Sequence, residues 1–172
     1  MSEMHLKELF AKVRDGDKDA FVLIYNDLKH PVFTIAYRIV QSRESAEDIT
    51  HDIFVKLFVS PPDSSVRNPR AWIFRMTHNL AIDTLRQKQH SNVEGANSTL
   101  ATDFGDVTLR LDLERAIQKL DVQEREVLSL HLTGGLRFHE IANILNCSMP
   151  STYRTYRKAL RNLQVLLEGG VL

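Results

Sequence analysis

The chain has 172 residues, of which 43% are hydrophobic and 26% are charged, and its formal net charge is zero. These values are ordinary for a globular protein and allow one domain or two small ones, so they exclude fibrous and largely disordered chains. The charge is unevenly placed, however. Acidic residues collect at positions 44–52 and 94–112, whereas arginines and lysines collect after position 150. This separation indicates two different partners.

The first 40 residues predict a short helix over Leu6–Val13 and a long helix over Lys18–Val40, separated by the sequence Asp-Gly-Asp at positions 15–17. Apolar residues recur at helical spacing along one side of the long segment. They are Phe21, Ile24, Tyr25, Leu28, Val32, Ile35, Ala36 and Ile39. Pro31 removes one backbone donor and crowds the preceding turn, so we expect it to interrupt or kink this helix.

A third helix is predicted from its N-cap, Ser42, to about Phe58. Its buried face is expected to comprise Ala46, Ile49, Ile53 and Leu57. Glu44, Asp48 and Asp52 recur at i, i+4 and i+8 on another face, and we call them the acidic stripe. Like charges one turn apart destabilise a helix by about 0.2–0.5 kcal/mol per pair, so folding alone does not call for them. A basic partner surface accounts for the stripe; the alternative is an acidic face that meets only solvent.

Val59–Arg67 is rich in Pro and Ser and predicts a loop. Asn68-Pro69 then predicts the start of a fourth helix, which extends to about Lys88. Its buried residues are expected to be Ile73, Met76, Leu80 and Leu85. Near another face lie Trp72, Arg75, Asn79 and Arg86. An exposed indole beside Arg and Asn suits stacking on unpaired bases; the alternative is that Trp72 belongs to the core and Arg75 pairs with an acid.

Residues 91–108 have no helical period and predict a flexible linker, at most about 60 Å long when extended. The linker divides an N-terminal domain (1–90) from a C-terminal domain (109–172). Leu109–Leu120 and Val122–Leu132 predict the first two helices of the C-terminal domain. The expected fold class is therefore all-α, with two small helical domains joined by a flexible linker.

The segment after residue 137 predicts a helix-turn-helix: a short helix over Phe138–Leu145, a turn at Asn146-Cys147, and a longer helix capped by Ser148. The inward side of the longer helix is expected to carry Thr152, Tyr156, Ala159, Leu163 and Leu166. Off this side lie Arg154, Arg157, Lys158 and Arg161. No acidic residue occurs between positions 148 and 167, whereas solvated surface helices usually mix charges. The pattern is that of a helix-turn-helix whose second helix enters a DNA major groove.

Cys147 is the single cysteine, so an intrachain disulfide is excluded and a reducing, cytoplasmic location is expected. Its place in the turn favours a small buried side chain, with a redox sensor as the alternative. No apolar run approaches the length of a membrane span, and the polar N-terminus is unlike a signal peptide. We therefore expect no insertion into a membrane.

Three segments resemble the extracytoplasmic-function (ECF) sigma factors of bacterial RNA polymerase, in the sigma-70 family. SAEDITHDIFVKLF resembles the family's clamp-binding helix, and NPRAWIFRMTHNLAIDTLRQ resembles its promoter-melting helix. LDVQEREVLSLHLTGGLRFHEIANILNCSMPSTYRTYRKALRNL resembles its domain that reads the −35 element. The three segments occur in the family's order around a polar linker and cover nearly the whole chain. The resemblance implies a promoter-specificity subunit that binds core polymerase and initiates transcription.

The resemblance also implies roles for matching residues. Asp48 and Asp52 are implied to bind basic residues of the polymerase clamp helices. Contact with the separated −10 strand is implied for Lys56, Ser64, Arg67, Arg75 and Asn79. Contact with the −35 element is implied for Ser151, Tyr153, Arg154, Arg157, Lys158 and Arg161. Trp72 is implied to support its helix instead of stacking on DNA.

The implied partners are core RNA polymerase, through its clamp helices and flap, promoter DNA, and an anti-sigma factor. No cofactor, metal or small-molecule substrate is implied. The chain departs from the usual family pattern at Leu120-Asp121, where Leu-Pro is usual, and at Pro150, Tyr153 and Thr155. These departures preserve the docking mode, but they prevent the preferred promoter sequence from being taken from a relative.

Three other classes of function compete with this interpretation. A stand-alone helix-turn-helix regulator needs a ligand pocket or dimer face within residues 1–90, where the acidic stripe occurs instead. A protein-binding adaptor leaves the arginines of the last helix without a purpose. An enzyme is not expected, because the seven histidines are scattered and neither a nucleophile–base pair nor a Gly-rich phosphate loop is evident.

Overall fold

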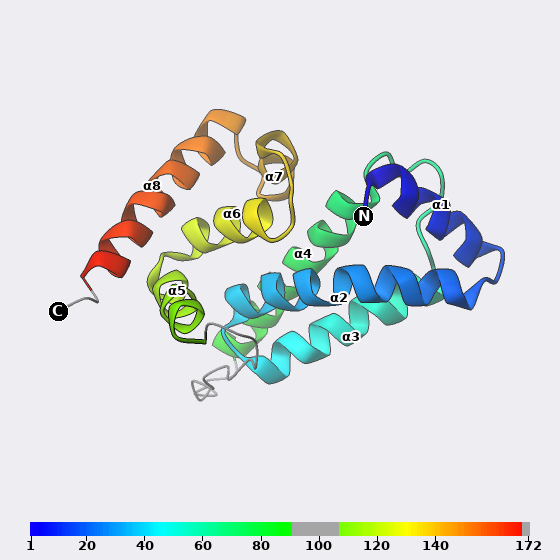
Figure 1. The fold of residues 1–172 in the computed structure, drawn as a ribbon, viewed down its shortest axis with the longest axis horizontal. Coiled ribbons are helices and arrows are strands. Elements are labelled where there is room, and N and C mark those ends of the chain that lie inside the picture. Colours follow the sequence, from blue (N-terminus) through cyan, green and yellow to red (C-terminus); the bar gives the residue numbers. More distant parts are fainter. Residues whose placement is uncertain (91–106, 170–172) are drawn as a thin grey trace.

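The computed structural model describes residues 1–90 and 107–169, which form eight helices and no strand (Figure 1). The helices are α1 (Glu3–Arg14), α2 (Lys18–Val40), α3 (Arg43–Val59), α4 (Pro69–His90), α5 (Val107–Lys119), α6 (Val122–Leu132), α7 (Phe138–Ile144) and α8 (Met149–Glu168). The expected all-α fold is confirmed. Within the described ranges, no helix offers an apolar stretch of the length that a bilayer requires.

The helix starts follow from local capping. The hydroxyl of Ser42 accepts from the Ser45 amide at 3.4 Å at the start of α3, and the side chain of Asn68 accepts from the Ala71 amide at 2.9 Å at the start of α4. The expected interruption at Pro31 is wrong, because α2 is one helix from Lys18 to Val40.

Pro31 is accommodated because α2 is held by packing on both sides of it. Leu28 and Val32 are both completely buried. Helices α2, α3 and α4 enclose the core of the N-terminal half, and α1 packs on α2. The largest fully buried side chains of these four helices are Leu6, Phe10, Ile24, Leu28, Ile35, Ile39, Leu57, Ile73 and Phe74.

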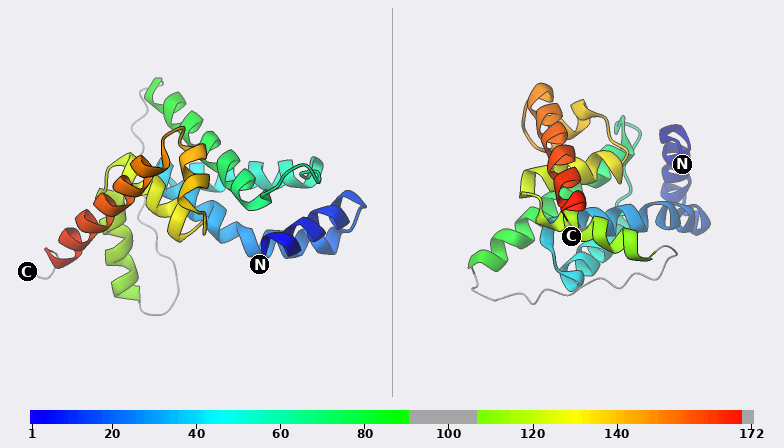
Figure 2. Two further views of the ribbon diagram at one scale, coloured as in Figure 1. Left: turned by 90° about the horizontal axis from the view of Figure 1, so that it is seen from above. Right: turned by 60° about the vertical axis from the view of Figure 1, so that its left-hand side comes forward.

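The C-terminal half packs directly on the N-terminal half, because α6 lies between α2 and α8 (Figures 1 and 2). The main apolar cluster therefore continues into Val127, Leu130, Leu136, Ile141 and Ile144. A second, smaller cluster joins α5, α6 and α8 through Ala116, Ile117, Leu120, Leu128, Ala159 and Leu163. The expected linker lies almost entirely outside the described residues, and the division into two domains stays a prediction.

Gly134 marks a close approach between the halves. A Cβ atom at this position would lie 3.2 Å from the ring of Phe74 on α4 and 2.6 Å from the carbonyl oxygen of Leu130. The next residue, Gly135, has a φ of 68°, a left-handed conformation that glycine adopts without strain. The two glycines thus end α6 and let its C-terminus lie against α4.

Candidate nucleic-acid interface

The helix-turn-helix is held together by aromatic rings from three helices. Phe138, at the start of α7, stacks on His131 of α6 with ring centroids 4.5 Å apart. The same ring lies 5.2 Å from Tyr156 and 5.3 Å, edge to face, from Tyr153, both on α8. Since aromatic pairs prefer such tilted and offset geometries, the cluster fixes the direction of α8 relative to α7.

Helix α8 turns its apolar side inward, as predicted. Thr152 and Ala159 are buried, and Leu163 is nearly so. The predicted −35 residues lie together on the opposite side, where they line a hollow of about 430 Å³ with Thr155. The lining residues are Ser151, Tyr153, Arg154, Thr155, Arg157, Lys158 and Arg161. The structure therefore gathers the whole predicted set on one exposed surface.

The cations on this surface have different surroundings. Arg157 lies beside Tyr153, with Nη1 3.4 Å from the phenol oxygen and the guanidinium carbon 6.0 Å from the ring centroid. Lys158 instead lies 2.8 Å from Oε1 of Glu124 and 3.1 Å from Oδ2 of Asp121. Sequence reasoning missed both carboxylate partners, although Asp121 stood out as a departure from the family pattern.

The ion pairs around Lys158 shift two pKa values. The hydrogen bond to Glu124 raises the pKa of Lys158. Partial burial raises the pKa of Asp121, but the hydrogen bonds from the Glu124 amide and from Lys158 more than offset this, so the pKa lies below its ordinary value. Both shifts favour the charged forms.

Cys147 is exposed, so the expectation of a buried side chain is wrong. The preceding residue, Asn146, has a φ of 51°, and this left-handed turn directs the chain outward before α8 begins. The buried place is taken by Thr152, whose hydroxyl oxygen lies 3.1 Å from the Cys147 sulfur.

The acidic stripe is exposed along α3. Within the described residues, neither Asp48 nor Asp52 forms a hydrogen bond or ion pair. Both line a hollow of about 380 Å³ between α3 and α4, opposite Leu80 and Thr84 of α4. The predicted buried face of α3 is confirmed. The stripe is therefore free to meet another molecule, which is what the sequence led us to expect.

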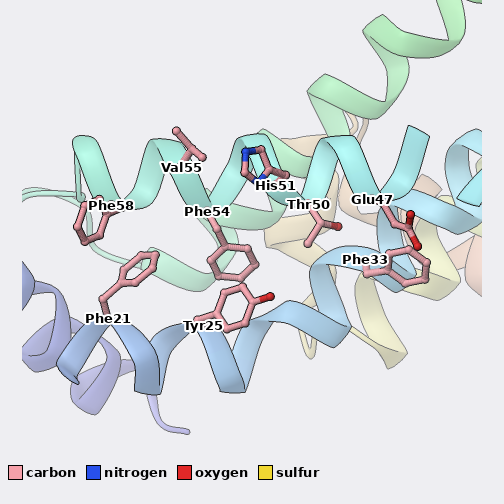
Figure 3. Close-up of a pocket in the computed structure, with 9 residues that line it drawn as sticks. All are labelled: Phe21, Tyr25, Phe33, Glu47, Thr50, His51, Phe54, Val55 and Phe58. Atoms are coloured by element: carbon pink, nitrogen blue, oxygen red, sulfur yellow. The ribbon is translucent and has the colours of Figure 1, made fainter. Parts of the chain in front are cut away.

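A groove lined by aromatic residues lies on the neighbouring side of α3, and sequence reasoning missed it. Figure 3 shows Phe21 and Tyr25 of α2 directed toward Phe54 and Phe58 of α3. The groove has a volume of about 480 Å³ and is completed by Phe33, Glu47, Thr50, His51 and Val55. The periodicity of α2 assigned Phe21 and Tyr25 to its buried side, but Tyr25 is exposed.

The predicted −10 residues on α4 face the C-terminal half. The guanidinium of Arg75 donates to the carbonyl oxygen of Asn143 on α7 at 3.2 Å. Asn79 lines a hollow of about 610 Å³ together with Ser151 and Thr155 of α8. The neighbouring His78 has Nε2 3.3 Å from Oε1 of Glu126. In this arrangement one side of the predicted melting helix is covered by the helix-turn-helix.

Two further contacts locate this part of the chain. The side-chain amide of Asn68, the N-cap of α4, donates to Glu140 in the capping box of α7. Trp72 is partly buried and packs on the main apolar cluster, as expected of a residue that supports its helix.

The loop before α4 is fixed by residues that the sequence did not single out. Arg14 of α1 donates to the carbonyl oxygen of Pro62, and the Ser65 amide donates to Oδ1 of Asp63 at 2.8 Å. Hydrogen bonds from Ser65 lower the pKa of Asp63. The predicted contacts Ser64 and Arg67 are exposed on this loop, and Lys56 is exposed near the end of α3.

Family models match both halves of the chain. Sigma-70 region 2 matches residues 24–91, and Sigma-70, region 4 matches residues 110–163. The chain belongs to the sigma-70 family of RNA polymerase sigma factors, in its ECF group. The acidic stripe and α4 lie in region 2 of the sigma factor, and the helix-turn-helix lies in region 4. A stand-alone regulator is not favoured, because region 2 occupies the place where such a protein needs a ligand pocket or dimer face.

Relatives and solved structures agree with this assignment. The sigma factor is 29% identical over 187 residues to ECF RNA polymerase sigma factor SigW of Bacillus subtilis (strain 168), covering 94% of this chain and 100% of that one. It is 26% identical over 176 residues to ECF RNA polymerase sigma factor SigK of Mycobacterium ulcerans (strain Agy99), covering 95% and 94%.

Its fold is similar to the sigma factor RpoE in complex with the anti-sigma factor NepR from Bartonella quintana, with a TM-score of 0.74, 22% identity and coverage of 88% and 98% of the two chains. It is also similar to CnrH in complex with the cytosolic domain of CnrY, with a TM-score of 0.70, 22% identity and coverage of 96% and 98%.

Proposed function

We propose that this sigma factor directs core RNA polymerase to specific promoters and catalyses no reaction of its own. The observation that carries the proposal is the placement of two oppositely charged, exposed surfaces on different halves of one chain. The acidic stripe lies on α3, and the cationic surface lies on α8. A molecule that must hold a basic protein and DNA at the same time needs this separation.

Core polymerase binds at α3 in this proposal. Asp48 and Asp52 meet basic residues of the clamp helices, and the carboxylates gain partners that they lack within the described residues. Opposite charges of this kind raise the rate of association and fix the register of the complex. The aromatic groove beside the stripe adds apolar contact area, while the first helices of the C-terminal half dock on the flap.

Promoter DNA is read at two places. Helix α8 enters the major groove at the −35 element, where Arg157 reads a base edge and Arg154 and Arg161 contact DNA nearby. Ser151 and Tyr153, at the N-terminal end of α8, complete this surface. The separated −10 strand is held by Lys56, Ser64, Arg67, Arg75 and Asn79. Opening of the base pairs is driven by binding energy, because unstacking a base costs a few kcal/mol.

The chain must open before it can do both. The two promoter elements are about 25 base pairs apart, or roughly 85 Å along B-DNA at 3.4 Å per base pair. In the described arrangement Asn79 and Ser151 line the same hollow. We therefore propose that this closed arrangement is the DNA-free state, and that binding to core polymerase separates the halves. An anti-sigma factor, like those bound to the two similar structures, holds the closed or partly closed state.

Transcription from a genomic library with added core polymerase tests the proposal. The full chain is expected to start transcription at a restricted set of promoters that share −35 and −10 sequences. The variant that carries Asp48→Arg and Asp52→Arg is expected to start at none of them. If the wild-type chain gave no promoter preference beyond that of core enzyme alone, the proposal would be wrong.

A further inference from the structure

Lys158 differs from the arginines around it, because the protein itself already holds its ammonium group. Its Nζ is bound by Oε1 of Glu124 at 2.8 Å and by Oδ2 of Asp121 at 3.1 Å. Within the described residues, Arg154 and Arg161 have no hydrogen-bond or ion-pair partner. Arg157 has only the hydroxyl of Tyr153. The cations on α8 are therefore of two kinds.

We propose that Lys158 is a positioning residue: it fixes the recognition helix on the N-terminus of α6 and does not neutralise a DNA phosphate. This inference rests on the proposed function, since it concerns how α8 is presented to the −35 element. It removes Lys158 from the residues that the family resemblance implies as DNA contacts and leaves the three arginines in that role.

The contacts around Lys158 form a network that joins α6 to two successive turns of α8. Oε1 of Glu124 also accepts from the side-chain amide of Asn162 on α8 at 2.8 Å. Asp121 caps α6 by accepting from the Glu124 amide at 2.8 Å, and Glu124 accepts from the Asp121 amide at 3.4 Å. The two carboxylates thus form the capping box of α6 and hold α8 at the same time.

DNA is a poor competitor for this lysine. The Glu124 side chain is only 2% exposed, so removal of Lys158 to a phosphate leaves a nearly buried carboxylate with Asn162 as its remaining partner on α8. An uncompensated buried charge is strongly unfavourable. The group of Asp121, Glu124 and Lys158 also carries two negative charges and one positive charge. It therefore repels phosphates instead of attracting them.

The network accounts for a departure from the family pattern. Asp121 stands where the family usually has proline. A proline offers neither a side-chain acceptor for the cap nor a carboxylate for Lys158. The unusual aspartate and the lysine 37 residues later therefore act as one unit.

Promoter binding by the full chain with core polymerase, measured at several salt concentrations, tests the proposal. Lys158→Met is expected to leave the salt dependence unchanged and to reduce the preference for an intact over a scrambled −35 element by about two- to fivefold. In D121N/E124Q the lysine is released, so the slope of log affinity against log salt is expected to steepen by about 0.9, the value for one phosphate contact. Adding Lys158→Met to D121N/E124Q returns the slope to that of the wild type.

Lys7→Met, an exposed lysine on α1, is the matched control and should change neither quantity. A slope that falls by about 0.9 in Lys158→Met alone means that Lys158 contacts phosphate, and overturns the proposal. An unchanged −35 preference in Lys158→Met also overturns it, because a helix that is no longer positioned must read its site less well.

Thermal unfolding of the free chain tests the network without any promoter. Lys158→Met and D121N/E124Q are expected to lower the melting temperature, and their combination to lower it by less than the sum. Additive losses mean that the groups are not coupled and overturn the proposal. A coupled network in a chain that shows no promoter preference with core polymerase would instead reject the proposed function alone.

Discussion

Nε of Arg38 on α2 lies 3.2 Å from Oε2 of Glu114 on α5, so an ion pair joins the two halves of the sigma factor. The Arg38 side chain is only 9% exposed, whereas that of Glu114 is 32% exposed. Nη1 of Arg38 also donates to the hydroxyl of Thr133, at the end of α6, at 3.0 Å. Arg38 is thus a nearly buried cation whose partners all come from the other half of the chain.

Glu114→Gln should weaken the closed arrangement, because it removes the charge opposite Arg38. Hydrogen bonds to charged groups are worth about 1.5–3 kcal/mol, and partial exposure reduces this, so we expect the free energy of unfolding to fall by about 1–2 kcal/mol. Small-angle scattering should show a larger radius of gyration. Asp112→Asn, which removes the exposed pair with Arg115 on the same helix, is the control and should stay within about 0.5 kcal/mol of the wild type. Equal effects of the two variants would contradict this role of Arg38.

The features that sequence predicted well are those set by residues close together in the chain. Ser42 and Ser148 cap α3 and α8 because a side-chain oxygen reaches an amide three residues on. The inward side of α8 follows from helical periodicity in the same way. Pro31 misled, because packing over the whole of α2 outweighs one lost backbone hydrogen bond.

Contacts between distant residues could not be predicted. A linker without a helical period does not say which faces of the two halves meet, so the bond from Asn68 to Glu140 and the pairing of Arg38 left no local signal. The partners of Lys158 were equally hidden, although Asp121 was noticed. The roles of Asp48 and Asp52 stay predictions, because their exposure permits partner binding without identifying the partner.

Asp48→Arg combined with Asp52→Arg should abolish association with core polymerase, because it places positive charge against a basic surface. Folding should be little affected, since the change removes a like-charge repulsion along α3. Pull-down with core enzyme and circular dichroism check both statements. Glu8→Arg, another exposed charge reversal on α1, is the control and should still bind. Retained binding by the double variant with normal helicity would show that the stripe is not the polymerase contact.

Arg157→Ala should cost about 1–3 kcal/mol at one position of the −35 element, because a bidentate contact to one base edge is lost. Binding of the polymerase complex to a set of single-base −35 variants measures this cost. Tyr153→Phe, which retains the ring and removes the hydroxyl beside Arg157, should weaken the same position to a smaller extent. A uniform loss over all promoter variants means that Arg157 contacts phosphate.

Asp121→Asn should make stability less sensitive to acid. The folded-state pKa of Asp121 lies below its ordinary value of 3.8, so its contribution is fully present above that value and is lost as the pH falls through the lowered one. Because asparagine is an equally good N-cap, the substitution removes the charge and keeps the cap. Urea unfolding should therefore show the wild type more stable at about pH 6, with the difference vanishing toward about pH 2. A difference that is constant over this range would contradict a charged role for Asp121.

The central claim is that promoter sequence is read only after core polymerase has engaged the acidic stripe and opened the chain. The affinity of the full chain for a promoter fragment, measured with and without core polymerase, tests it most directly. We predict sequence-specific binding with core polymerase and only weak, nonspecific binding without it, because the closed arrangement turns Arg75 and Asn79 toward the C-terminal half. Equally tight and specific binding by the free chain would contradict the account and identify a stand-alone DNA-binding regulator.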